Sequence, residues 1–122
     1  MPGPAASRDS ADWPGLLTLT QSPHERHALR ELWLMRFPQA RVVAARTVAD
    51  AALAVASGGI AVAVIDTRLT LPLAALVHQL RRLGPEVSLM AYGAPTSATL
   101  AAAAGAPHVH SWRELKALLQ NW

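Results

Sequence analysis

The chain has 122 residues, of which 52% are apolar and 16% charged. This composition predicts one globular domain with a modest core, and it excludes two ordinary domains or a disordered chain. Cysteine is absent, which excludes disulfides, thiolate metal sites and cysteine nucleophiles, and eleven basic against eight acidic residues give a net charge of +3. The arginines are scattered without interleaved aromatic residues, so an ordinary solvated surface is favoured over direct nucleic-acid binding. Because no stretch is long and apolar enough to span a membrane and no signal core is present, we expect a cytoplasmic protein.

Strand and helix patterns alternate after a tail at 1–14 that is rich in Pro, Ala, Ser and Gly, and we expect one domain at 15–122. Ser22, Thr47 and Ser111 predict helix N-caps. Five β-α units in strict alternation imply an α/β fold with a parallel sheet and helices on both faces. The predicted strands are 16–20, 41–45, 59–66, 87–91 and 109–110, and the predicted helices are 23–37, 48–56, 71–83, 96–104 and 112–119.

Asp66 closes the apolar run at 59–65, which is typical of a buried parallel strand. An acid at the carboxyl end of such a strand points into the crevice where open α/β sheets bind ligands. The alternative is that its carboxylate accepts backbone N–H bonds in the following loop, as Asp commonly does in turns.

Other candidate site residues form no complete constellation. His24 and His27 have a spacing compatible with metal binding, but no Asp, Glu or Cys is placed to complete a site, so two exposed histidines are expected. His110 lies near the predicted crevice without a nucleophile to act on. We therefore expect no metal and no cofactor.

Several strings together resemble the receiver domain of bacterial response regulators, from Leu16 to about Leu119. They are Ala63-Val-Ile-Asp-Thr-Arg-Leu69, the leucine-rich helix after it, Ser88-Leu-Met-Ala-Tyr-Gly93, and Ala-Gly-Ala106 before a short strand. The resemblance implies a flavodoxin-like three-layer (βα)5 fold with strand order 2-1-3-4-5. In that family, two acids after the first strand hold magnesium, an aspartate ending the third strand accepts a phosphoryl group, a Thr or Ser ends the fourth strand, and a Lys-Pro pair follows the fifth.

A position-by-position check retains only the aspartate, at Asp66. The acidic pair falls on Thr20 and Gln21, which offer no charge to a hard cation. The Thr or Ser position falls on Tyr92, whose phenol we expect to be too large for the small pocket, and His110 lies nearest to the missing lysine. Because phosphoryl transfer depends on positioning and charge neutralisation, we expect an atypical, non-enzymatic receiver that is not phosphorylated.

The last predicted helix carries an apolar face formed by Trp112, Leu115, Leu119 and Trp122. In receivers the last helix, with the fourth helix and fifth strand, is the usual dimer or partner surface, although the same residues could equally pack the core. The predicted function is signal transduction or transcriptional regulation through a protein partner or a homodimer. The chain would act either as the sensing half of a transcriptional regulator, with a C-terminal DNA-binding output domain outside this chain, or as a stand-alone adaptor. The alternatives are an authentic receiver phosphorylated on Asp66, or a small flavodoxin-like enzyme or ligand-binding domain.

Overall fold

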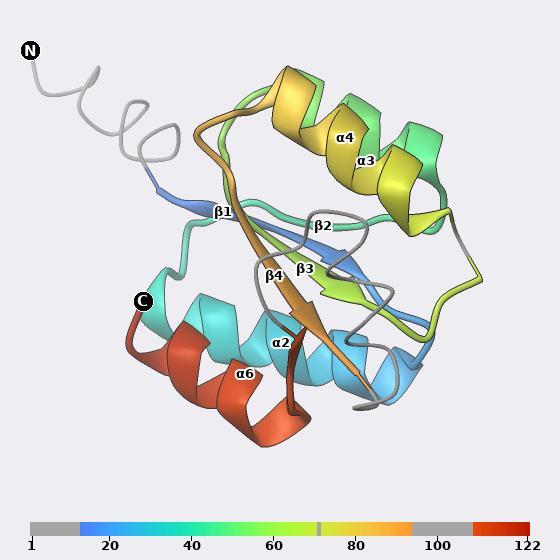
Figure 1. The fold of residues 1–122 in the computed structure, drawn as a ribbon. Coiled ribbons are helices and arrows are strands. Elements are labelled where there is room, and N and C mark those ends of the chain that lie inside the picture. Colours follow the sequence, from blue (N-terminus) through green and yellow to red (C-terminus); the bar gives the residue numbers. More distant parts are fainter. Residues whose placement is uncertain (1–12, 71, 94–108) are drawn as a thin grey trace, which may run out of the picture.

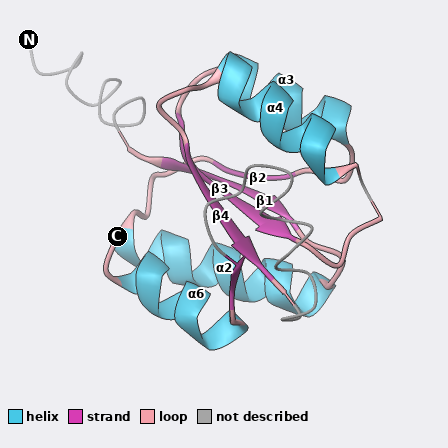
Figure 2. Cartoon of the chain, in the orientation of Figure 1, coloured by secondary structure: helices cyan, strands magenta, loops and turns pink. Residues whose placement is uncertain are grey.

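The computed structural model describes residues 13–70, 72–93 and 109–122, and the helix predicted at 96–104 lies outside these residues. Strands and helices alternate along the described chain (Figures 1 and 2), and each predicted element there is present with ends within two residues of the prediction. The elements are β1 (Gly15–Leu19), α2 (Pro23–Arg36), β2 (Val42–Ala44), α3 (Val48–Ala56), β3 (Ile60–Asp66), α4 (Leu73–Leu83), β4 (Ser88–Tyr92), β5 (Val109–His110) and α6 (Trp112–Gln120).

The five strands form one parallel sheet in the order β2-β1-β3-β4-β5, which confirms the predicted fold class. In the register of this sheet, Asp66 lies opposite Tyr92, and Tyr92 lies opposite His110. Leu19 lies opposite Ile65, so Thr20 is level with Asp66. The sheet register therefore brings the carboxyl ends of four strands to one place.

Helices α2 and α6 cover one face of the sheet, and α3 and α4 cover the other (Figure 1). Leu16 of β1 and Val64 of β3 pack in the core layer of α2 and α6. Because side chains alternate between the faces of a strand, Thr20 and Asp66 fall on the same side as Leu16 and Val64. Tyr92 packs in this layer too. Strand periodicity thus places these polar side chains beneath α2.

Helix starts follow the predicted caps. The Ser22 hydroxyl accepts a hydrogen bond from the Glu25 N–H at 3.1 Å, and Ser111 forms a capping box with Glu114. The Thr47 hydroxyl caps α3 by accepting a hydrogen bond from the Asp50 N–H at 3.0 Å. The cap at Ser22 fixes Glu25 in the first turn of α2, directly after the loop that leaves β1.

Aromatic side chains pack together at the amino ends of the strands. Trp33 is fully buried, and its indole N–H donates to the Pro14 carbonyl oxygen at 2.8 Å. The Trp13 ring meets Phe37 edge-on at 6.3 Å between ring centroids, and the Trp122 ring lies 5.4 Å from that of Trp33. Trp13 and Pro14, which fall in the predicted tail at 1–14, therefore contact Phe37 and Trp33.

Among the helices of the described residues, none combines the length and the apolar character needed to cross a bilayer.

Candidate functional site

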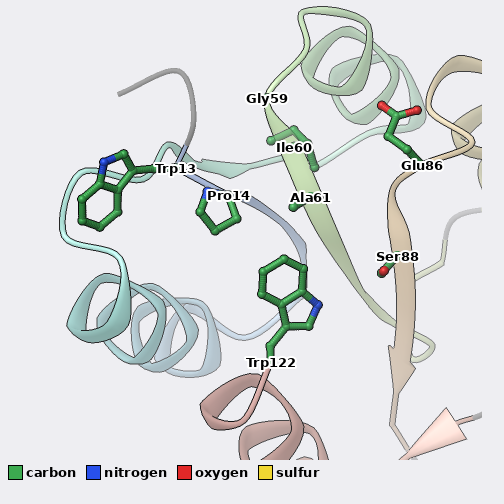
Figure 3. A pocket seen from close by; sticks show the side chains of 8 residues that line it. All are labelled: Trp13, Pro14, Gly59, Ile60, Ala61, Glu86, Ser88 and Trp122. Carbon is green, nitrogen blue, oxygen red and sulfur yellow. The ribbon is translucent and has the colours of Figure 1, made fainter. Parts of the chain in front are cut away.

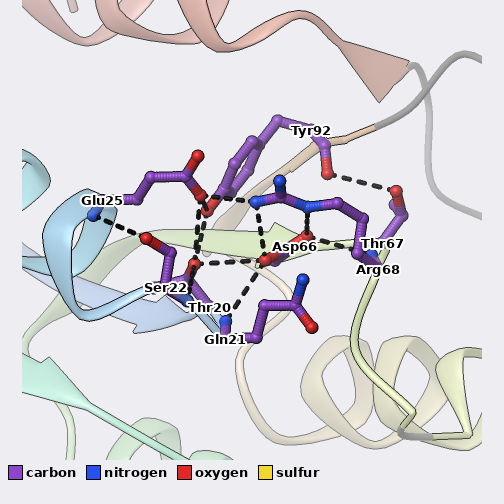
Figure 4. Close-up of polar contacts among 8 residues, drawn as sticks. All are labelled: Thr20, Gln21, Ser22, Glu25, Asp66, Thr67, Arg68 and Tyr92. Carbon is purple, nitrogen blue, oxygen red and sulfur yellow. Dashed lines mark hydrogen bonds and ion pairs between the residues drawn. The ribbon is translucent and has the colours of Figure 1, made fainter.

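Six residues meet at the carboxyl end of the sheet, and we call them the Asp66 pocket (Figure 4). They come from the loop after β1, the first turn of α2, the end of β3 with its following loop, and the end of β4. The residues are Thr20, Gln21, Glu25, Asp66, Arg68 and Tyr92.

Asp66 is 0% exposed, and both of its carboxylate oxygens are engaged. Oδ1 accepts hydrogen bonds from the Arg68 backbone N–H at 3.0 Å and from Arg68 Nε at 2.8 Å. Oδ2 accepts from Thr20 Oγ1 at 3.1 Å, the Gln21 N–H at 3.2 Å and Arg68 Nη2 at 3.0 Å. The predicted bond to a loop N–H is therefore confirmed, as one of five donors that surround this carboxylate.

Arg68 supplies the positive charge in the pocket. Its guanidinium forms a two-pronged ion pair with Asp66, and Nη2 also donates to Glu25 Oε1. Burial would raise the pKa of the Asp66 carboxyl, but hydrogen bonds from the Arg68 side chain and from the backbone outweigh burial and hold that pKa below its ordinary value. Hydrogen bonding to Asp66 raises the pKa of Arg68 against the opposing effect of burial, and Glu25 adds to the rise. Asp66 and Arg68 are therefore fully charged at neutral pH.

Tyr92 fills the space next to this ion pair. Its side chain is 1% exposed, and its hydroxyl lies 2.6 Å from Thr20 Oγ1 and 2.8 Å from Glu25 Oε1. Burial, together with the charges of Glu25 and Asp66, raises the pKa of the phenol above its ordinary value. The expectation that a phenol is too large for this pocket is wrong, because Tyr92 enters from β4 with its hydroxyl between Thr20 and Glu25.

The loop after β3 is fixed against the end of β4. The Thr67 N–H and Oγ1 both donate to the Tyr92 carbonyl oxygen, at 2.9 and 3.2 Å. Gly93 has a φ of +153°, and a Cβ at this position would lie 2.2 Å from Thr67 Oγ1. Only glycine fits this approach, so the backbone that carries Arg68 is held against β4.

The other predicted site residues have lesser roles. Gln21 contributes only its backbone N–H to Asp66, and His110 pairs with Tyr92 in the sheet and accepts a hydrogen bond from the Gly93 N–H through its carbonyl oxygen at 3.2 Å. His24 and His27 lie on α2, and the described residues hold no group of three or more His, Cys, Asp or Glu side chains suited to a metal ion.

Sequence reasoning missed Glu25 and Arg68 as site residues. Glu25 has the spacing of a helix-cap residue, and that explanation is sufficient until the fold places its carboxylate beside Tyr92. Arg68 lies two residues after Asp66 in a loop. The one available signal was a basic residue two positions after the acid that ends a strand. The side chain of such a residue can fold back and bind the carboxylate.

The predicted interface residues on α6 divide into two groups. Leu115 and Leu119 are 0% exposed and belong to the core with Trp33, so they are unavailable to a partner. Trp112 is half-buried, with its ring 5.4 Å from that of Tyr92, and Trp122 is 41% exposed. The prediction of an interface is therefore wrong for the two leucines, which are core residues because α6 lies directly on the sheet.

A second feature lies at the opposite ends of the strands. A hollow of about 420 Å³ opens there (Figure 3), and we call it the amino-end hollow. Its lining carries one carboxylate and one hydroxyl beside apolar side chains that include two tryptophans. The lining residues are Trp13, Pro14, Gly59, Ile60, Ala61, Glu86, Ser88 and Trp122.

Comparison with solved structures identifies the fold. The signal receiver domain of a DNA-binding response regulator from Colwellia psychrerythraea gives a TM-score of 0.69 at 14% identity, covering 88% of this chain and 96% of that chain. The receiver domain of a Pseudomonas aeruginosa sensor histidine kinase, with magnesium coordinated in its active-site cleft, gives 0.69 at 18% identity, covering 90% of this chain and 97% of that chain. This chain has the receiver-domain fold.

A CheY-like protein from Pseudomonas aeruginosa is also similar, with a TM-score of 0.63 at 20% identity over 89% of this chain and 94% of that chain. No protein-family model and no curated protein matches the sequence. Similarity at this level of identity establishes the fold and leaves function to the site.

The residues of this chain do not fit the magnesium ion that the receiver fold implies. Thr20 and Gln21 bring no carboxylate, and the Thr20 hydroxyl is already bonded within the pocket. The Arg68 guanidinium takes both oxygens of Asp66. A divalent cation placed there would meet a positive charge, so the Asp66 pocket is an ion-paired network rather than a metal site.

Proposed function

We propose that this chain is a receiver-like signalling module that works through protein contacts and does not accept a phosphoryl group. The observation that carries the proposal is the state of Asp66, which is 0% exposed with both carboxylate oxygens bonded to Arg68. Phosphoryl transfer requires the attacking oxygen to approach phosphorus in line with the leaving group. In the Asp66 pocket, Arg68 must leave its ion pairs before any such approach.

Charge leads to the same proposal. The transferred group carries negative charge, which needs positive charge that is free to stabilise it in the transition state. Arg68 carries one positive charge, but Glu25 and Asp66 already neutralise it. Tyr92 occupies the position at which a receiver has a short hydroxyl, and its phenol fills the neighbouring space.

Incubation with acetyl phosphate and magnesium, followed by intact-mass measurement, tests this proposal. We expect the mass to remain that of the unmodified chain, under conditions in which an orthodox receiver gains one phosphoryl group. Asp66→Asn is the matched control. A phosphoryl adduct on the native chain that is absent from Asp66→Asn would instead establish the authentic phosphorylated receiver.

Contact with a partner is proposed at the start of α6. The Trp112 ring lies 5.4 Å from the Tyr92 ring, and the Lys116 ammonium lies 5.4 Å from the Trp112 ring centroid. Trp112 thus connects the Asp66 pocket to the molecular surface, and large aromatic residues commonly dominate binding energy. The partner, a second copy or another protein, would dock here and along β5.

Sedimentation over a concentration series tests this contact. We expect self-association that needs no phosphodonor and that weakens in Trp112→Ala, whereas Arg82→Ala, an exposed position on α4, leaves it unchanged. A strict monomer at every concentration would remove the homodimer and leave a heterologous partner.

The wider role that we propose is non-enzymatic signal transduction or transcriptional regulation in the cytoplasm. The receiver fold supports signalling, and the lack of cysteine is compatible with a reducing compartment. An output domain for DNA binding would lie outside this chain.

A further inference from the structure

The positive charge of Arg68 lies between the carboxylates of Asp66 and Glu25. Arg68 Nη2 donates to one oxygen of Asp66 and to one oxygen of Glu25. Thr20 Oγ1 lies 3.1 and 3.4 Å from the same two oxygens. The two carboxylates therefore converge, and the guanidinium lies where they meet.

We infer that Arg68 is a tethered cation that takes the place of a divalent metal ion between Glu25 and Asp66. Removing its charge is then sufficient to turn this point into a divalent-cation site. The inference rests on the proposed function, because it states what holds the pocket in one arrangement without metal or phosphoryl group. Two converging carboxylate oxygens are ligands that Mg²⁺ and Mn²⁺ accept, with water completing the coordination.

The placement of Arg68 is supported from a second direction. Its guanidinium carbon lies 5.6 Å from the centroid of the Tyr92 ring, so the cation is bounded by two carboxylates and an aromatic face. The second acid, Glu25, comes from the first turn of α2. The point that Arg68 occupies is therefore defined by residues of this chain and not by the acidic pair that the receiver resemblance implies after β1.

Arg68→Ala tests the inference. We expect Mg²⁺ or Mn²⁺ to raise the melting temperature of Arg68→Ala saturably, because a ligand that binds only the folded state stabilises it, and we expect EDTA to reverse the rise. The native chain should show no such shift at the same metal concentration. The double variant Arg68→Ala, Glu25→Gln should lose the response, and Arg68→Lys, which keeps a positive charge, should never gain it.

Arg82→Ala is the matched control, since it removes an exposed arginine from α4 and should gain no metal response. A folded Arg68→Ala protein that binds no divalent cation would overturn the inference. Mn²⁺ broadening of nuclear magnetic resonance signals is a separate measurement on the native chain, which does not depend on the folding of any variant. Selective broadening at Thr20 and Asp66 in the native chain would overturn the inference, and its absence would support it. Neither result depends on acetyl phosphate, so failure here is distinguishable from failure of the proposed function.

Discussion

The two ends of the sheet use their side chains in opposite ways. At the carboxyl end, the Asp66 pocket is closed, and the described residues contain no buried side-chain polar atom without a hydrogen-bond partner. At the amino end, Trp13 and Trp122 help to line an open hollow of about 420 Å³ (Figure 3). The charged and hydroxyl groups at the carboxyl end are thus bonded to one another, whereas the lining of the amino-end hollow has one carboxylate and one hydroxyl. This difference indicates that the Asp66 pocket serves here as an ion-paired network that connects β1, α2, β3 and β4.

The largest expected effect comes from the amino end. Trp33→Ala should lower the free energy of unfolding by about 3–5 kcal/mol, as large-to-small changes at buried aromatic residues do. Trp33 is 0% exposed, contacts Phe37 and Trp122, and donates to Pro14. Urea denaturation measures the change, and Trp122→Ala, at a partly exposed position, should cost far less. Equal costs for the two tryptophans would contradict this description of the aromatic packing.

The second prediction concerns the ion pair at the carboxyl end of the sheet. Arg68→Ala in metal-free buffer should lower the free energy of unfolding by about 2 kcal/mol, because it leaves Asp66 buried without its counter-ion. The expected loss is smaller than that for a fully buried ion pair, because the Arg68 side chain is 35% exposed and solvent screens its charge. Arg82→Ala should change stability by less than about 0.5 kcal/mol, as surface substitutions do. An Arg68→Ala protein as stable as the native chain would show that the ion pair does not stabilise the folded chain.

The third prediction concerns the loss of stability at low pH. The pKa of Asp66 is lower in the folded chain than its ordinary value of about 3.9, so the carboxylate contributes stability above about pH 4. That contribution is lost as pH falls from this value through the folded pKa. Asp66→Asn cannot lose it, so the native chain should show a steeper decline in unfolding free energy below about pH 4 than the variant. Parallel profiles for the two proteins, measured by denaturation at a series of pH values, would contradict the assigned role.

Sequence patterns sufficed for the fold because its signals are local. The apolar run before Asp66 and the cap residues Ser22, Thr47 and Ser111 each act within a few positions along the chain. Together they predicted the described elements and their alternation. The predicted helix at 96–104 lies outside the described residues and stays a prediction.

The site was harder to predict because its bonds join residues far apart in sequence. Glu25 meets Tyr92 across 67 positions and Arg68 across 43. No local pattern indicates such pairs, and Glu25 already had a sufficient explanation as a cap residue. The receiver pattern marks Tyr92 as a departure, but only the geometry reveals that its phenol fills the pocket. The same applies to Leu115 and Leu119, whose apolar pattern fits a core and an interface equally well.

The central claim, that the Asp66 pocket is closed by its own side chains, is tested most directly by the ionisation of Tyr92. The chain has a single tyrosine, so the rise in ultraviolet absorbance on tyrosinate formation reports this residue alone. Burial and the neighbouring acids raise the pKa of Tyr92, so the folded chain should show no ionisation at pH values near about 10, whereas the urea-unfolded chain should titrate there. Stability should accordingly fall as the pH rises above about 10, because only the unfolded chain then loses the proton. A midpoint near pH 10 in protein that circular dichroism confirms as folded would mean that the phenol is solvated and the pocket open, and would contradict the claim.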